Sequence, residues 1–138
     1  MNKTISVGII VLGMQMNDEI LMVENDGLYS LPEISIESSQ RNNIVDIGND
    51  LVKKIGAKVD DLALAYVLEQ KVPESDECVI TYYFVTSALN NDVEDGYEWV
   101  SKAYDKMDTA IYPTKFIESL KNKLTNGWRV TVEVIKTK

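Results

Sequence analysis

The stretch that most constrains the fold runs from Leu31 to Ala57. It opens with Leu31-Pro32, where the proline removes a backbone donor and so ends a strand, and it continues through polar residues. An amphipathic segment follows, with its apolar residues at helical spacing: Ile44, Ile47, Leu51 and Ile55. Because Asn43 suits an N-cap and Gly56 suits a C-terminal stop, the pattern predicts a strand, a loop and a helix in succession.

Segments typical of β-strands lie on both sides of this helix. The first, Ile5 to Leu12, is apolar on both alternating faces, as in a central buried strand, and its Gly8 would let another element approach closely. Further strands are expected at 19–24, 28–31, 62–71, 78–86, 97–100 and 128–135, and a second helix is expected to open at Pro113. This order predicts an α/β protein whose mixed sheet is covered by helices.

The composition is that of a soluble globular protein, and residues 1–138 are expected to form one domain. The net charge is −8; residues 1–112 carry −12 and residues 113–138 carry +4. An acidic body repels a phosphate backbone, so we expect no general nucleic-acid binding. The apolar run near the N-terminus is too short to span a bilayer, and no cleavage site follows it, so we expect a cytoplasmic protein without a membrane anchor.

The sequence holds no histidine and one cysteine, Cys78. These counts exclude an internal disulfide, histidine zinc sites and Ser-His-Asp or Cys-His triads. Acid–base chemistry would therefore rest on Asp, Glu, Lys or Tyr.

The order of these elements resembles that of the Nudix hydrolase superfamily. Tyr29-Ser30-Leu31-Pro32 stands where the family has W-x-L-P, the helix ends in Gly56 at about the family's distance, and the segments from Tyr97 and from Pro113 match the family's second half. The resemblance implies a Nudix-like α/β/α sandwich with a mixed sheet. It also implies hydrolysis of nucleoside-diphosphate derivatives with Mg²⁺ or Mn²⁺ held by helix carboxylates.

Most of the catalytic residues of the family's motif are replaced by other residues in this sequence. Lys53 and Lys54 replace its paired glutamates, whereas Asp50 stands at its first helix glutamate. Glu33 and Ile34 replace both glycines of its turn. Because two ammonium groups repel a divalent ion that two carboxylates would attract, these changes predict a degenerate site.

Three sets of candidate residues follow. Asp46 and Asp50 could act as catalytic residues and as a rebuilt metal pair, with Glu33 or Glu37 reaching in from the loop; alternatively they form a solvated helix face. Lys53 and Lys54 could instead contact an anion directly, or merely complement the negative end of the helix. Tyr29 could stack on a ligand, whereas Tyr83 and Trp99 are expected in the core.

Three hypotheses remain. The one we favour is a Nudix-like protein that binds a nucleotide-type ligand or a protein partner with little or no hydrolysis. The second is an active Mg²⁺- or Mn²⁺-dependent hydrolase that uses the substitute carboxylates. The third is an interaction protein on an unrelated α/β fold. Pairing of two copies through the apolar strands at either end of the chain is a further option.

Overall fold

A computed structural model describes residues 2–14, 18–36, 43–129 and 131–137. Its helices and strands follow the predicted order, with one additional strand. The elements are β1 (Asn2–Leu12), β2 (Glu19–Asn25), β3 (Leu28–Ser30), β4 (Glu33–Ile36), α1 (Ile44–Ile55), β5 (Ala63–Lys71), β6 (Glu77–Ser87), β7 (Tyr97–Ser101), the short 3₁₀ helix η1 (Ala103–Asp105), α2 (Thr114–Asn126) and β8 (Glu133–Lys136).

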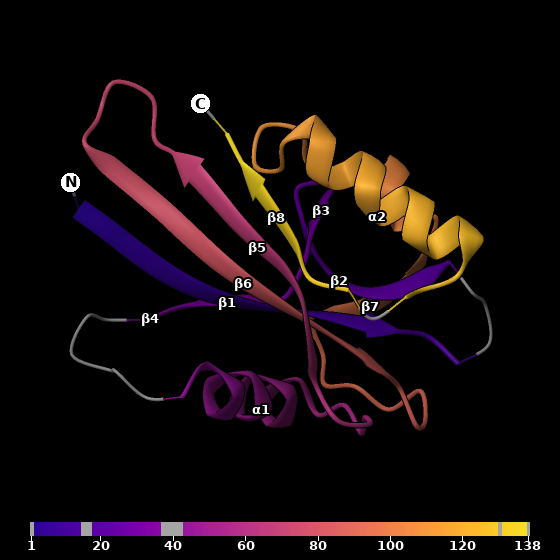
Figure 1. Cartoon of the computed structure of the whole chain (residues 1–138). Helices are drawn as coiled ribbons and strands as arrows, with labels where there is room; N and C mark the ends of the chain where they lie inside the picture. The colour runs from indigo at the N-terminus through magenta and orange to yellow at the C-terminus, as the bar shows by residue number, and fades with distance from the viewer. Residues whose placement is uncertain (1, 15–17, 37–42, 130, 138) are drawn as a thin grey trace.

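The strands form one mixed sheet in the order β3-β2-β1-β6-β5-β8, with β4 paired to β1 and β7 paired to β2. The two long central strands, β1 and β6, run parallel, and so do β5 and β8, whereas the other pairs are antiparallel. Helix α1 covers one face of this sheet and α2 covers the other (Figure 1). The predicted α/β/α sandwich with a mixed sheet is therefore confirmed.

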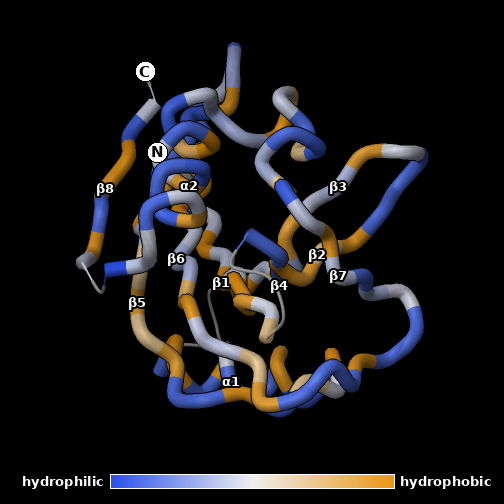
Figure 2. The backbone as a smooth tube through the Cα atoms, turned by 90° about the vertical axis from the view of Figure 1, so that its right-hand side faces the viewer, coloured by the Kyte–Doolittle hydropathy of each residue, from blue (hydrophilic) through white to orange (hydrophobic). Residues whose placement is uncertain are grey.

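Two hydrophobic clusters hold the layers together, one on each face of the sheet. Alternate residues of β1 divide between them: Ile9 packs toward α1, and Ile10 packs toward α2. The same alternation in β6 sends Phe84 to the α1 side and Tyr83 to the α2 side. Figure 2 shows the apolar residues of α1 alternating with polar ones along the helix, as its amphipathic pattern requires.

Helix α1 begins and ends where its sequence predicts. The Asn43 side chain accepts a hydrogen bond from the Val45 N–H at 2.9 Å, and Gly56 adopts a left-handed conformation with φ of +78°. Gly48 is buried against the sheet, where an added Cβ would lie 2.9 Å from Cδ1 of Leu62. The helix therefore lies close to the strands that it covers.

The last strand is shorter than its alternating pattern predicts. Among the described residues of this segment, only Glu133–Lys136 pairs with the sheet, whereas Trp128 packs edge-on against Tyr66 at a centroid distance of 6.2 Å. Val132 and Val134 of the alternating set are exposed, whereas Ile135 is buried, so the alternation does not mark the buried face of this strand. No helix of the described part of the chain is long and apolar enough to cross a membrane.

Candidate functional site

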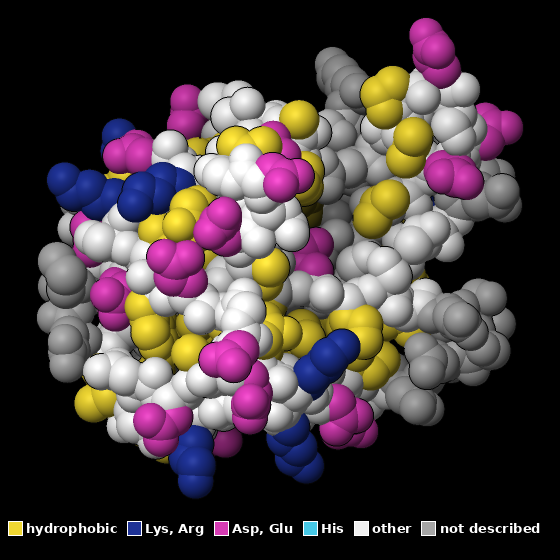
Figure 3. All heavy atoms as spheres, turned by 180° about the vertical axis from the view of Figure 1, so that it is seen from behind, with side chains coloured by type: hydrophobic (Ala, Val, Ile, Leu, Met, Phe, Trp, Pro, Cys, Tyr) yellow, Lys and Arg dark blue, Asp and Glu magenta, His cyan; other side chains and the backbone are white. Residues whose placement is uncertain are grey.

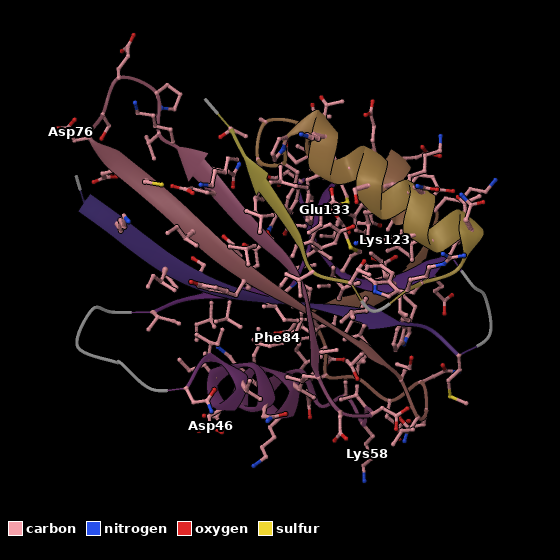
Figure 4. The ribbon with its side chains drawn as sticks, viewed as in Figure 1. Asp46, Lys58, Asp76, Phe84, Lys123 and Glu133 are labelled. Atoms are coloured by element: carbon pink, nitrogen blue, oxygen red, sulfur yellow. The ribbon has the colours of Figure 1, made fainter. Side chains whose placement is uncertain are left out.

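The solvent-facing side of α1 carries the residues that replace the family's catalytic carboxylates. Asp46 points away from the sheet (Figure 4), and both Asp46 and Asp50 are exposed. With Lys53 they line a shallow depression that is also lined by Asp60 and Asp61, just before β5. The depression is therefore mainly acidic. Sequence analysis missed Asp60 and Asp61, because no helical or strand pattern links them to α1.

The two lysines stand at the end of the same helix. Lys53 and Lys54 are exposed in its last turn, where the helix dipole favours cations. The acidic segment before β7 lies against this end, because the Glu94 N–H donates to the carbonyl oxygen of Ile55 at 2.8 Å. The ammonium pair can contact an anion or a partner side chain, but it supplies none of the carboxylates that a divalent ion needs.

Glu33 lies on the other side of the sheet. Its Oε2 atom accepts hydrogen bonds from the hydroxyls of Tyr83 and Tyr112, both at 2.8 Å. Both tyrosines belong to the cluster beneath α2 and are 1% exposed. Glu33 as a whole residue is exposed, but its carboxyl group lies against the two buried tyrosine hydroxyls. This local burial raises the pKa of Glu33, and the two tyrosine hydrogen bonds oppose that rise only in part. The Glu33 carboxylate is therefore engaged away from α1.

A glycine makes room for this arrangement. Gly8 of β1 pairs with Glu33 of β4 on one side and with Tyr83 of β6 on the other. A Cβ atom at Gly8 would lie 2.5 Å from two ring carbons of Tyr83 and 3.0 Å from Cγ of Glu33. The expectation that Gly8 permits a close approach is confirmed, and the group that approaches is the tyrosine ring.

Tyr112 is the residue of this cluster that sequence analysis missed. Its hydroxyl accepts a hydrogen bond from the Leu31 N–H at 2.8 Å while it donates to Glu33. Burial is the main cause that raises the pKa of Tyr112, and the nearby Glu33 carboxylate adds to it. The sequence holds no signal for this contact, since 79 residues separate Tyr112 from Glu33.

Tyr29 stands apart from the α1 residues. Its hydroxyl donates to Glu98 at 3.2 Å, and its ring packs at the edge of the cluster beneath α2. The structure thus brings Asp46, Asp50 and Lys53 together and leaves Tyr29 and Glu33 on the other face. The remaining candidate, Glu37, lies outside the described residues.

We tested whether these side chains fit Mg²⁺ or Mn²⁺. Within the described ranges, no three Asp, Glu or Cys side chains are placed to hold one metal ion together. The exposed aspartates of α1 are followed by two lysines, and Glu33 is held by tyrosines on the far face. The described donor set therefore does not fit the divalent ion that the resemblance implies.

Comparison with solved structures identifies the class of fold. The chain superposes on a Nudix hydrolase from Nitrosomonas europaea with a TM-score of 0.64 and 12% identity, covering 99% of this chain and 81% of that one. It superposes on the mutator MutT protein from Bacillus halodurans with a TM-score of 0.70 and 11% identity, covering 98% and 90%. An ADP-ribose pyrophosphatase from Streptococcus suis gives a TM-score of 0.63 and 18% identity, covering 97% and 98%.

The chain thus has a Nudix-like fold, and the alternative of an unrelated α/β fold is wrong. No protein-family model and no curated protein sequence matches it. At these identities the likeness shows the fold alone, so activity has to be argued from the site.

Proposed function

We propose that this protein is a Nudix-like binding protein that takes a nucleotide-type ligand or a protein partner and performs little or no metal-dependent hydrolysis. The observation that carries the proposal is the position of Glu33. Of the two loop carboxylates expected to complete a metal site with Asp46 and Asp50, Glu33 is the one whose place is described, and it accepts hydrogen bonds from Tyr83 and Tyr112 on the opposite face.

The distribution of charge also supports little or no hydrolysis. Acidic side chains are spread over the face shown in Figure 3, and four aspartates line the depression beside α1. Without a metal ion to bridge them, these carboxylates repel a pyrophosphate group. Lys53 and Lys54 at the helix end are the candidates for contact with a phosphate group or with acidic side chains of a partner.

The main alternative is an active Mg²⁺- or Mn²⁺-dependent hydrolase of nucleoside-diphosphate derivatives. The observation that favours it is the depression itself, because Asp60 and Asp61 line it together with Asp46 and Asp50. In that case Asp50 would be the indispensable ligand.

The deciding experiment measures phosphate and pyrophosphate release from nucleoside triphosphates, dinucleotides and nucleotide sugars with Mg²⁺ and then with Mn²⁺. We expect no turnover by the folded protein. The variant pair is Asp50→Asn and the matched control Asp76→Asn, an exposed aspartate in the β5–β6 turn that lies far from Asp46 in Figure 4. Turnover that Asp50→Asn abolishes and Asp76→Asn retains would refute the proposal.

Binding is measured on the same panel by calorimetry. We expect the double variant Lys53→Gln, Lys54→Gln to weaken binding of any nucleotide that binds, because it removes both cations from the end of α1. The matched control is Lys115→Gln, Lys121→Gln, two exposed lysines of α2. Equal loss in both double variants would mean that only net charge matters.

A further inference from the structure

One face of the sheet is covered by α1 over only part of its length. The covered part includes Ile9 of β1 and Phe84 of β6, which belong to the buried cluster beneath α1. Strand side chains alternate between the two faces, so Ile5 of β1 and Ile80 and Tyr82 of β6 lie on this same face. Figure 1 shows the first residues of β1 and β6 extending beyond both helices. Ile5 is accordingly 37% exposed, and Ile80 and Tyr82 are only half-buried although β6 is a central strand.

The register of the sheet continues this apolar surface onto neighbouring strands. Tyr82 pairs with Val67 of β5, and Val67 pairs with Val134 of β8. In the other direction Tyr82 pairs with Val7 of β1, and Val7 pairs with Ile34 of β4. Directly paired side chains lie on the same face, and of these Ile34 and Val134 are exposed. We call this surface the uncovered face; its apolar members are Ile5, Ile34, Val67, Ile80, Tyr82 and Val134.

Lysines border the uncovered face, although the net charge of the protein is −8. Lys3 of β1 and Lys71 of β5 both pair with Cys78 of β6, so the two exposed lysines stand on either side of it. Lys136 of β8 pairs with Glu69 of β5, and its Nζ lies 3.7 Å from Oε2 of Glu69. Glu69 is therefore already engaged, whereas Lys3 and Lys71 form no salt bridge with any described residue.

We propose that the uncovered face is the docking site for an amphipathic helix of a partner protein, with acidic side chains beside its apolar stripe. The apolar face of a sheet is normally buried against another element, and exposed apolar patches mark interaction sites. A strand rises about 3.3 Å per residue, so the segment from Cys78 to Tyr82 spans roughly 15 Å, enough for a helix about 10–12 Å wide. Such a helix would lie beside α1 in the same layer, and its carboxylates would meet Lys3 and Lys71.

The same charges argue against two other occupants. Self-pairing of the uncovered face with a second copy would bring two sets of lysines into one interface, and the described strands place no carboxylate on this face besides Glu69. An anionic membrane attracts lysines but repels a protein whose net charge is −8. The inference does not rest on the function proposed above, since the residues that carry it lie neither on α1 nor in the depression beside it.

The probes are two synthetic amphipathic helices with the same leucine stripe, one flanked by glutamates and the other by lysines. Fluorescence anisotropy of the labelled peptides measures binding, and isoleucine methyl signals in NMR spectra of the protein locate it. We expect the glutamate peptide to bind more tightly than the lysine peptide and to shift the signals of Ile5, Ile34 and Ile80. The signal of Ile111, an exposed isoleucine just before α2, should stay in place. No binding of the glutamate peptide, equal binding of both peptides, or shifts at Ile111 instead would overturn the proposal.

A charge reversal tests the lysines. The double variant Lys3→Glu, Lys71→Glu should weaken binding of the glutamate peptide at least tenfold and strengthen binding of the lysine peptide. The matched control, Lys115→Glu, Lys121→Glu, changes the net charge equally on the exposed side of α2 and should leave both affinities unchanged. Equal effects of the two double variants would mean that only net charge matters, and they would overturn the proposal.

A second pair of variants tests the apolar surface and carries the test if the charge-reversed protein does not fold. Ile5→Thr keeps a residue that suits a strand and should weaken the glutamate peptide at least tenfold, whereas Ile111→Thr should not. Sedimentation velocity and cosedimentation with phosphatidylserine vesicles test the other two occupants. A dimer that Ile5→Thr dissociates and Ile111→Thr retains would assign the face to a second copy. Vesicle binding that Lys3→Glu, Lys71→Glu abolishes would assign it to a membrane, and either result overturns the proposal.

Discussion

The hydroxyl of Tyr112 lies 2.8 Å from Oε2 of Glu33 and 2.8 Å from the backbone nitrogen of Leu31. One side chain just before α2 thus joins the residues on both sides of Pro32. Leu31 is 2% exposed, so its N–H has no access to water when this bond is lost. The contact therefore fixes how the chain enters β4.

Tyr112→Phe should lower the free energy of unfolding by about 1–3 kcal/mol, because it leaves the buried Leu31 N–H without an acceptor. Denaturant unfolding followed by circular dichroism measures the change. The matched control is Tyr104→Phe, whose half-buried ring lies 5.5 Å from the Lys121 ammonium, and it should change the stability by less. Equal losses in the two variants would show that the bond to Leu31 contributes little.

Glu33→Gln should change how stability depends on pH. Burial raises the pKa of folded Glu33 above its unfolded value, so the folded state holds the proton more tightly. The stabilisation that protonated Glu33 gives the folded state is complete below the pKa of Glu33 in the unfolded chain, about 4.3. It is lost as the pH rises through the pKa of Glu33 in the folded protein. Glutamine cannot ionise, so the stability of the wild type relative to Glu33→Gln should fall as the pH rises from about 4. Denaturant unfolding of both proteins at a series of pH values from about 4 upward provides the measurement. A difference in the free energy of unfolding that stays constant with pH would contradict the prediction.

The sequence predicts α1 closely because its signals are local. Asn43 caps the helix and Gly56 ends it, as the pattern indicates, and the strong β pattern of Cys78 to Thr86 lies within β6. The expected burial of Tyr83 is confirmed as well.

Elements that depend on distant partners are predicted less well. β4 was not expected, because Pro32 correctly ends β3 and nothing local shows that Glu33–Ile36 pairs with β1. The same holds for the candidate site. Glu33 was grouped with Asp46 and Asp50 because it is near them in the sequence, but the face of a sheet on which a side chain lies is set by strand register. Tyr112 and Tyr83, which decide the position of Glu33, come from two other elements.

Gly8→Ala should destabilise the protein by about 1–3 kcal/mol, the usual cost of forcing an extra methyl group into a packed core. The new methyl would lie 2.5 Å from the ring of Tyr83, so β1 or the ring has to move. A double-mutant cycle with Tyr83→Leu tests the cause, because the smaller side chain should recover part of the loss. Additive effects of the two substitutions would place the strain elsewhere.

Divalent ions should not stabilise the folded protein beyond their effect on ionic strength. A ligand that binds the native state raises the thermal midpoint, and the described carboxylates do not form a set that fits Mg²⁺ or Mn²⁺. We expect MgCl₂ and MnCl₂ to shift the midpoint as far as NaCl does at equal ionic strength, and EDTA to leave it unchanged. Asp50→Asn should respond to all three salts as the wild type does. A larger shift with Mn²⁺ that disappears in Asp50→Asn would mean that the aspartates beside α1 do hold a metal ion, and it would favour the hydrolase over the binding protein.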